Sequence, residues 1–336
     1  KTDGTIQKDL DDGIDTIGKK MTVCQLYAKQ IRHRGNVRYN TKNGRKRLMK
    51  LLEEDKLGGC PIDSVKLSDA KEWAIRMKEK GISYKTISND KRSLKAAFYT
   101  AIQDDCIRKK PFDFQLNTVI EDDTEPKVPL TPAQEESFLS FAQNDKVYQK
   151  YYDELIILLG TGFRISELCG LTDTDIDFEN RIINVDHQLL RSAETGYYIE
   201  TPKTKSGIRQ IPMSEKVYEA FNRVLKRRRG AKAVTIDGYS NFLFLNRDGY
   251  PKTATNYDGM FRGHAKKYNK YHEEALPKVM TPHTLRHTFC TNMANAGMNP
   301  KALQYITGHS NITMTLNYYA HATFDSAKAE MLRIAA

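Results

Sequence analysis

Six side chains between residues 164 and 319 are of the types needed to cut a phosphodiester. Two arginines, a lysine, two histidines and a tyrosine lie in four short strings: TGFRISELCGL, TPKTKSGIRQIPM, TPHTLRHTFCT and ITGHSNITMTLNYYAH. In-line attack on a phosphodiester places more negative charge on its non-bridging oxygens, which paired arginines can hold bidentately. A tyrosine hydroxyl can carry a covalent intermediate, and a lysine can protonate the departing oxygen. Together the strings predict a transesterification site.

Each string taken alone has a simpler explanation. Arg164 and Glu167 are three residues apart and could form an exposed ion pair on one helix face, worth about 0.2–0.5 kcal/mol. His283 and His287 are four apart and could face a metal, but the zincin pattern requires a glutamate where Thr284 stands. The strings contain no carboxylate cluster of the kind that holds Mg²⁺. The combination therefore predicts chemistry with no metal and no cofactor.

The order of these residues resembles the tyrosine recombinase family of phage-type integrases. The shared settings are TGxRxxEL, PKT followed by RxIP, HxLRHTF and GHSxxxxTLxxYxH, and the resemblance covers residues 128–336. Within the family, the chain is most similar in character to the integrases of conjugative transposons. The resemblance implies a site-specific recombinase that works through a 3′-phosphotyrosyl intermediate and a Holliday junction, and that excises and integrates a conjugative transposon.

Matching positions to the family's motifs implies a role for each residue. Arg164 and Arg286 would clamp the scissile phosphate. His283 and His309 would support the phosphate and the transfer of protons, and Glu167 would orient the clamp.

Two of the implied roles fall on pairs of neighbouring residues. The P-K-T setting favours Lys203 over Lys205 as the general acid. The Y-x-H ending favours Tyr319 as the nucleophile, whereas a count of nine from His309 selects Tyr318. Successive helical residues point about 100° apart, so only one tyrosine can reach the phosphate.

The elements that must position these residues predict a mixed α+β catalytic domain over residues 132–336. Runs rich in β-branched residues at 181–190, 197–204 and 208–213 predict a small antiparallel sheet. The last predicted helix continues past the tyrosines, and its segment 322–336 is expected to dock on a neighbouring protomer. Apolar spacing predicts helices at residues 132–145, 148–159, 214–229, 255–271, 283–296, 299–307 and 311–333.

The preceding part, residues 21–116, predicts an all-α, SAM-like helical bundle that corresponds to the family's core-binding domain. The acidic, proline-containing stretch 117–131 is interpreted as an interdomain linker, and the two domains are expected to enclose a DNA duplex as a C-shaped clamp. Residues 1–20 are interpreted as a linker from a preceding arm-binding domain. The residues expected to contact DNA are Lys42, Arg45, Lys46, Arg47, Lys85, Lys91, Arg92 and Lys95.

Composition narrows the class of protein. The 336 residues include 53 Lys and Arg against 42 Asp and Glu, which gives a net charge of +11. Such an excess favours nucleic-acid partners, because binding phosphates releases condensed counterions. No apolar run approaches the roughly 18 residues of a membrane span. Five dispersed cysteines indicate a reduced, cytoplasmic protein rather than a disulfide or zinc framework.

The resemblance also predicts partners. The expected partner is double-stranded DNA, in the form of transposon ends, a circular intermediate and target sites, bound by a homotetramer in synapsis. The resemblance also implies an excisionase-type accessory protein. The expected location is the cytoplasm of a bacterium, on the DNA of the nucleoid, with no membrane association. One alternative is a type IB topoisomerase, which would use the same residues as a monomer. The other is a non-catalytic DNA-binding protein on the same fold, although every catalytic residue type is present.

Overall fold

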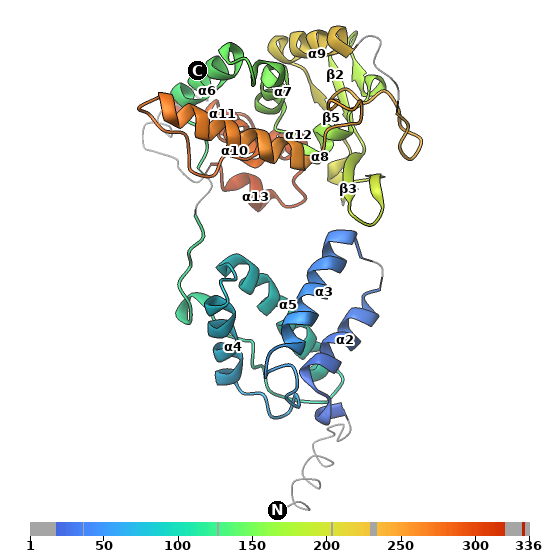
Figure 1. Cartoon of the computed structure of the whole chain (residues 1–336), viewed down its shortest axis with the longest axis vertical. Coiled ribbons are helices and arrows are strands. Elements are labelled where there is room, and N and C mark those ends of the chain that lie inside the picture. Colours follow the sequence, from blue (N-terminus) through green and yellow to red (C-terminus); the bar gives the residue numbers. More distant parts are fainter. Residues whose placement is uncertain are drawn as a thin grey trace, which may run out of the picture. The chain divides into compact units, whose positions relative to one another are not determined.

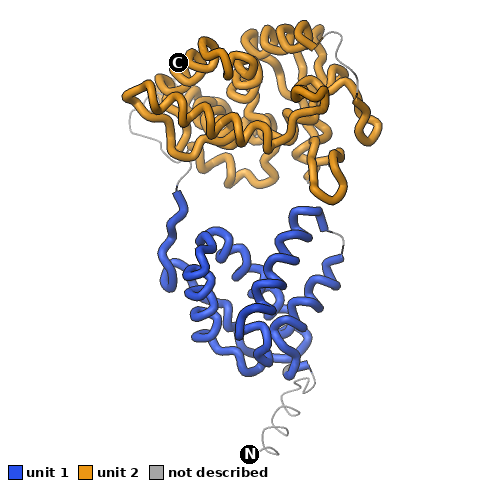
Figure 2. The backbone as a smooth tube through the Cα atoms, viewed as in Figure 1, with its two compact units in different colours: residues 1–126 blue, residues 127–336 orange. Residues whose placement is uncertain are grey.

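The computed structural model of the chain describes residues 18–35, 37–125, 128–202, 204–228, 234–319 and 331–332. The chain divides into two units, Lys1–Pro126 and Lys127–Ala336 (Figure 2). The boundary lies inside the predicted linker, but both ends of that linker pack on a unit. Ile120 is buried in the core of the first unit and Leu130 in the core of the second.

The first unit is a helical bundle, as predicted. Thr22 begins its first helix with a capping box, because the Thr22 side chain accepts from the Gln25 amide at 3.2 Å and the Gln25 side chain accepts from the Thr22 amide at 2.9 Å. Trp73 is fully buried, with its ring edge-on to Phe112 at 5.9 Å. The main helices are α2 (Val23–His33), α3 (Tyr39–Glu53), α4 (Leu67–Glu79) and α5 (Tyr84–Gln103), with short 3₁₀ turns η1 (Gly18–Lys20) and η2 (Leu116–Thr118) (Figure 1).

The second unit combines helices with antiparallel strands, which confirms the predicted fold class. Its helices are α6 (Pro132–Asn144), α7 (Tyr152–Thr161), α8 (Ile165–Gly170), α9 (Glu215–Arg228), α10 (Ala254–Tyr271), α11 (Pro282–Asn295), α12 (Pro300–Thr307) and α13 (Ile312–Leu316), with 3₁₀ turns η3 (Gln149–Tyr151), η4 (Asp173–Asp175) and η5 (Lys205–Gly207). The strands are β1 (Ile176–Asp177), β2 (Ile182–Val185), β3 (Gln188–Ser192), β4 (Gly196–Glu200) and β5 (Arg209–Pro212).

The strands form two sheets, not the single sheet that the sequence predicts. One has the order β1-β2-β5 and the other pairs β3 with β4, all antiparallel. The predicted strand 181–190 breaks at Asp186 and His187. The break occurs because the buried His187 ring turns to the carbonyl oxygen of Gly170, with Nε2 at 2.7 Å.

Helix α7 lies at the centre of the second unit, against α9 and α11. It approaches α9 closely at Gly160, where a Cβ atom would lie 2.4 Å from Cγ2 of Val217. Gly162 ends α7 with a left-handed φ of 63°, and its missing side chain leaves room for the Phe289 ring. This turn directs the chain into α8 and so places Arg164.

The predicted helix 311–333 is not continuous in the structure. Helix α13 ends at Leu316, and Tyr318 and Tyr319 follow it in a turn. The segment 322–336, predicted to dock on a neighbouring protomer, lies outside the described residues apart from Met331 and Leu332. Among the described helices, none combines the length and the hydropathy needed to cross a bilayer.

Candidate active site

Arg164 and Glu167 meet at the start of α8. The sequence places them on one helix face, but Arg164 is the residue before the helix and Glu167 lies in its first turn. The Glu167 carboxylate accepts from the Arg164 amide at 2.9 Å and from Arg164 Nη1 at 2.8 Å. The positive end of the helix also favours a carboxylate here. Glu167 is buried, while the Arg164 side chain keeps 34% of its surface exposed and can meet a ligand.

Three arginines from three elements converge on the C-terminal end of α12. The last carbonyl groups of a helix have no partners within it and carry the negative end of its dipole, so they attract cationic donors. Three consecutive carbonyls each take one arginine. The bonds join Arg209 Nε to Ile306 O at 2.6 Å, Arg286 Nη2 to Thr307 O at 2.5 Å, and Arg164 Nη2 to Gly308 O at 2.9 Å.

Gly308 makes this convergence possible. It caps α12 with a left-handed φ of 64°. A Cβ atom at this position would lie 2.8 Å from the carbonyl oxygen of Ser206 and 3.2 Å from Nη1 of Arg209. Both the backbone conformation and the space therefore require glycine.

The cluster carries an excess of positive charge. Arg286 is buried and also donates to the carbonyl oxygen of Gly162 at 2.6 Å. Burial, reinforced by the charge of Arg164, lowers the pKa of Arg286 to about 10. Burial alone would raise the pKa of Glu167, but the hydrogen bonds and charge of Arg209, with the charges of Arg164 and Arg286, hold it below its usual value. Three guanidinium groups thus surround one carboxylate, and the site favours an anion.

His309 is buried beside the arginines. Its Nδ1 lies 3.0 Å from Oγ1 of Thr315, which fixes the ring. Burial and then the charges of Arg286, Arg164 and Arg209 lower the pKa of His309 to about 4, so its imidazole is neutral at neutral pH.

The other predicted site residues on the phosphate side are placed differently. His283 is exposed on α11, one turn before Arg286. Lys203 lies outside the described residues. Lys205 is exposed at the start of η5, in the loop that leads into β5.

The two neighbouring tyrosines face different surroundings. The Tyr318 ring lies parallel to His309, with centroids 6.3 Å apart, and meets His287 edge-on at 4.9 Å. Burial, followed by electrostatic and hydrogen-bond interactions with the Cys290 side chain, raises the pKa of Tyr318 to about 12. These contacts favour Tyr318 as the residue at the arginine cluster.

Tyr319 has a different partner, outside the arginine cluster. Its hydroxyl donates to the carbonyl oxygen of Met298 at 2.5 Å. The structure therefore brings together Arg164, Glu167, Arg286, His309 and Tyr318, whereas the sequence favoured Tyr319 for the last place.

Sequence reasoning gave no role to Arg209, although the residue belongs to the RxIP string that carries the resemblance. Its side chain is fully buried, and it holds the Glu167 carboxylate with two bonds, at 3.1 and 2.8 Å. Buried and exposed residues alternate along β5, so that Arg209 and Ile211 both point inward. Such alternation in a strand is the pattern that could have indicated a buried Arg209.

The eight basic residues predicted to bind DNA fall into two groups. Lys91 donates to the carbonyl oxygen of Phe114 and lies over its ring, and Lys95 pairs with Asp113 at 2.5 Å. Arg45 and Arg47 also have partners within the unit: Arg45 Nη1 donates to the carbonyl oxygen of Arg34, and Arg47 Nη2 to the Asp90 carboxylate. The other four are exposed, and of these Arg92 donates from Nη1 to Oδ1 of Asn89 on its own helix at 3.3 Å; they are Lys42, Lys46, Lys85 and Arg92.

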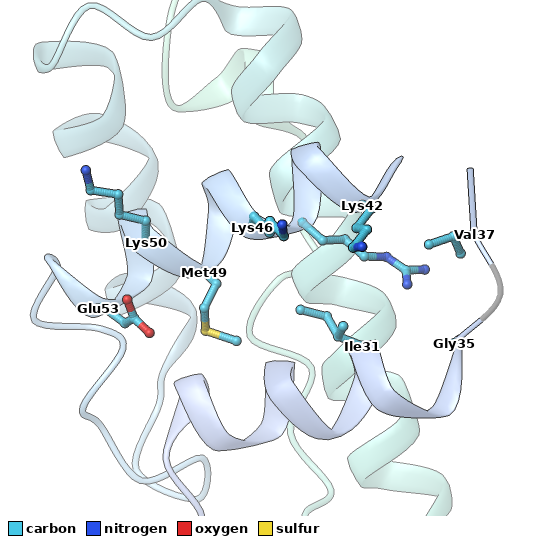
Figure 3. Close-up of a pocket in the computed structure, with 9 residues that line it drawn as sticks. Ile31, Gly35, Val37, Lys42, Lys46, Met49, Lys50 and Glu53 are labelled. Atoms are coloured by element: carbon cyan, nitrogen blue, oxygen red, sulfur yellow. The ribbon is translucent and has the colours of Figure 1, made fainter. Parts of the chain in front are cut away.

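A cavity of about 440 Å³ opens between α2 and α3. Figure 3 shows Ile31 and Met49 reaching into the space between the two helices, with Lys42 and Lys46 along α3. The cavity thus combines an apolar floor with a basic rim on the same helix that carries half of the exposed cations.

One group in the described part of the chain has the composition of a metal site. Asp175, Asp186 and His187 bring ligand atoms within 4.8 Å of one another. His187 Nε2 must donate to the carbonyl oxygen of Gly170, and Nδ1 lies 2.5 Å from the Asp186 carboxylate. Because both ring nitrogens are engaged, the group serves to anchor the break between β2 and β3.

Comparison with known proteins places this geometry in a family. Residues 129–326 match the phage integrase family. The transposase from transposon Tn916 of Enterococcus faecalis is 68% identical over 329 residues, which cover 98% of this chain and 81% of the relative. The structure of the Tn1549 transposon integrase in complex with a circular intermediate DNA is 77% identical, with a TM-score of 0.89, and covers 93% of this chain and 99% of the other.

A more distant structure shares only the fold. The lambda integrase dimer bound to a core site is 15% identical, with a TM-score of 0.60, and covers 90% of this chain and 78% of the other. The matched family, the identity to the transposon proteins and the cluster of arginines, histidine and tyrosine agree. This chain belongs to the phage integrase family, the tyrosine recombinases, which are enzymes that cut and rejoin DNA.

Proposed function

We propose that this chain excises and inserts a conjugative transposon by site-specific recombination. The observation that carries the proposal is the convergence of Arg164, Arg286, His309 and Tyr318 around the end of α12. The Tn1549 integrase, 77% identical, has been captured with a circular intermediate DNA and with transposon right end DNA. These are the DNA forms that excision and insertion require, and double-stranded DNA is the partner we assign to this chain.

The reaction needs no energy source, because each step exchanges one phosphodiester bond for another. The tyrosine oxygen attacks the scissile phosphorus while the bond to the 5′ oxygen breaks, and a proton passes to that oxygen. The 3′-phosphotyrosyl bond then receives a 5′-hydroxyl from another strand, which restores the tyrosine and joins the DNA. Two such exchanges form and resolve a Holliday junction, and they require four protomers.

The charges of the cluster suit the transition state. Arg164 and Arg286 are positioned by backbone carbonyls, so they can hold two non-bridging oxygens without reorganising. Neutral His309 can donate a hydrogen bond to the same oxygens, and exposed His283 lies one helical turn from Arg286. We assign the protonation of the leaving oxygen to Lys203, which the P-K-T setting favours over Lys205.

Tyr318 is the nucleophile that the contacts and the relatives support. Among the Tn1549 integrase complexes, one carries an arginine-to-lysine substitution and another a tyrosine-to-phenylalanine substitution. The interval between those two positions equals the interval from Arg164 to Tyr318, and it is one residue shorter than that from Arg164 to Tyr319. The proposal therefore replaces the residue that the Y-x-H ending favours.

The grip on DNA is assigned mainly to the exposed cations Lys42, Lys46, Lys85 and Arg92 of the first unit. The Tn916 relative comes from a bacterium, which supports the assignment of this reaction to DNA in a bacterial cytoplasm. An excisionase-type partner would set the balance between excision and insertion.

A nicked suicide substrate tests the proposal. Once the tyrosine attacks, the short 5′ product diffuses away and the protein stays attached to the 3′ end. We expect a covalent adduct on a denaturing gel, with EDTA present, and a free 5′-hydroxyl on the released strand. Absence of the adduct, or a strict requirement for Mg²⁺, would overturn it. Exchange between two labelled sites separates a recombinase from a topoisomerase, which only relaxes supercoils.

A further inference from the structure

Arg209 is the most enclosed charged side chain of the site. Its guanidinium donates to both oxygens of Glu167, to the carbonyl oxygen of Ile306 at 2.6 Å and to that of Gly207 at 2.9 Å. None of its side-chain surface is exposed, so it cannot touch DNA. A fully buried arginine needs such a set of partners. Two of them, Glu167 and Ile306, lie in α8 and α12, whose residues also bond the other arginines.

We propose that Arg209 is a positioning residue for cleavage, which holds the Glu167 carboxylate and the end of α12 so that Arg164 faces the scissile phosphate. This inference rests on the proposed function. Each oxygen of Glu167 is shared between two arginines: Oε1 accepts from Nη1 of Arg164 and Nη1 of Arg209, and Oε2 from the amide of Arg164 and Nη2 of Arg209. Without Arg209, each carboxylate oxygen loses one of its two donors.

Arg209 also holds the other two arginines through the C-terminal end of α12, in addition to its contact with Glu167. Arg209 binds the carbonyl of Ile306, and the next two carbonyls along the chain bind Arg286 and Arg164. Movement of this helix end would displace both clamp arginines together. A misplacement of about 1 Å can cost about 100-fold in rate, so a residue that never meets the substrate can control cleavage.

Two variants of Arg209 separate the contribution of its planar, multiply bonding guanidinium group from that of its charge. Arg209→Lys keeps a cation but cannot bridge Glu167 and Ile306 at once, and Arg209→Met removes the charge. Arg223→Lys is the matched control in the same unit, because Arg223 pairs with buried Asp153 at 2.7 Å and does not contact the arginine cluster. Arg164→Lys is the reference for direct loss of the clamp.

The experiment measures single-turnover cleavage on three suicide substrates. One has the ordinary phosphate. The second has a methylphosphonate, in which a neutral methyl replaces one non-bridging oxygen, tested as separate diastereomers. The third has a 5′-bridging sulfur, whose departure needs no protonation. Ratios of rates between substrates do not depend on the fraction of folded protein, so partial misfolding of a variant leaves the result interpretable.

We expect Arg209→Lys to slow cleavage of the ordinary phosphate by about 10- to 100-fold, with DNA affinity changed by less than about twofold. The defect should shrink on one methylphosphonate diastereomer, as for Arg164→Lys, because less charge needs stabilising, and it should persist on the sulfur substrate. Arg223→Lys should stay within about twofold on all three.

Three results overturn the inference. Parental rates for both Arg209 variants would show that the residue is dispensable. An equal defect on all three substrates would indicate a general structural role, and rescue by sulfur alone would place Arg209 with the proton donor. If instead the parent forms no adduct, or Arg164→Lys cleaves at the parental rate, the proposed function fails rather than the role of Arg209.

Discussion

The rings of Tyr318 and His309 lie parallel to one another, with an interplanar angle of 5° and their centroids 6.3 Å apart. Burial and the charges of all three clustered arginines in turn lower the pKa of His309. The adjacent Tyr319 has its hydroxyl bonded to the carbonyl oxygen of Met298. The turn after α13 thus directs one tyrosine to the arginine cluster and uses the other as an anchor.

Tyr319→Phe should affect stability more than chemistry. The variant loses one hydrogen bond to Met298, which is worth about 1 kcal/mol, so the free energy of unfolding should fall by about that amount. Single-turnover cleavage should remain within about threefold of the parent. Thermal unfolding and a gel-based cleavage assay measure the two quantities, and complete loss of the adduct in this variant would contradict the assignment.

Arg164→Lys should separate binding from cleavage. Lysine keeps the charge but cannot bond Glu167 and Gly308 while presenting a planar face to the phosphate. Cleavage should fall by at least about 100-fold, while DNA affinity changes little because many other phosphate contacts remain. Filter binding and suicide-substrate cleavage give the two values. Equal losses in both would mean that Arg164 merely positions DNA.

Gly308→Ala should disrupt the arginine cluster, and Gly297→Ala is its matched control. Both glycines have left-handed φ values, 64° and 79°, so alanine costs about 1 kcal/mol of strain at either. Only at Gly308 would the new Cβ atom meet Ser206 and Arg209, whereas Gly297 has open space. Thermal unfolding should show a larger loss for Gly308→Ala, together with loss of cleavage. Similar behaviour of the two variants would contradict this explanation.

The second unit should lose stability in mild acid. Burial among aromatic rings lowers the pKa of His264 from 6.5 to about 4. As the pH falls below about 6.5, His264 becomes protonated in the unfolded chain but stays neutral in the folded chain. The free energy of unfolding therefore decreases until about pH 4, where the folded chain is protonated as well. His264→Phe should reduce this decrease. Urea unfolding at several pH values measures it, and an unchanged slope in the variant would exclude His264 as a cause.

Exposed and paired lysines of the first unit should differ in their contribution to DNA binding. Lys46→Ala should weaken affinity several-fold and reduce the log–log salt slope by about one, because one phosphate contact is lost. Lys95→Ala should change affinity by less than about twofold, because this side chain is bonded to Asp113. Titrations at several salt concentrations compare them. The reverse order would reassign the DNA-facing surface.

Most elements were predictable because local patterns determine them. Thr131 has the side-chain and glutamine partners of a capping box, and the helix it begins was expected at 132–145 and extends over Pro132–Asn144. The break between β2 and β3 was not predictable, since it depends on a bond from His187 to Gly170 across 17 positions. The periodicity of the stretch 181–190 gives no sign of that contact.

The site was predictable in its residue types and less so in its geometry. The choice of Tyr319 over Tyr318 relied on the Y-x-H ending, and helical geometry predicted only that one of the two reaches the phosphate. Because α13 ends at Leu316, the turn after it determines where each tyrosine points, and helical spacing says nothing about a turn. Arg209 escaped notice because arginine is usually exposed. The alternation along β5 can indicate that it points inward, but its role follows from the tertiary contact with Glu167.

The central claim is that Tyr318 attacks the scissile phosphate beside the arginine clamp. The most direct test is to isolate the covalent adduct of the parent protein on a suicide substrate, digest both components, and map the modified peptide by tandem mass spectrometry. Tyr318 and Tyr319 are adjacent, so fragment ions between them must be resolved. We expect a nucleotide on Tyr318 alone, and none in Tyr318→Phe. A nucleotide on Tyr319, or on neither residue, would contradict it.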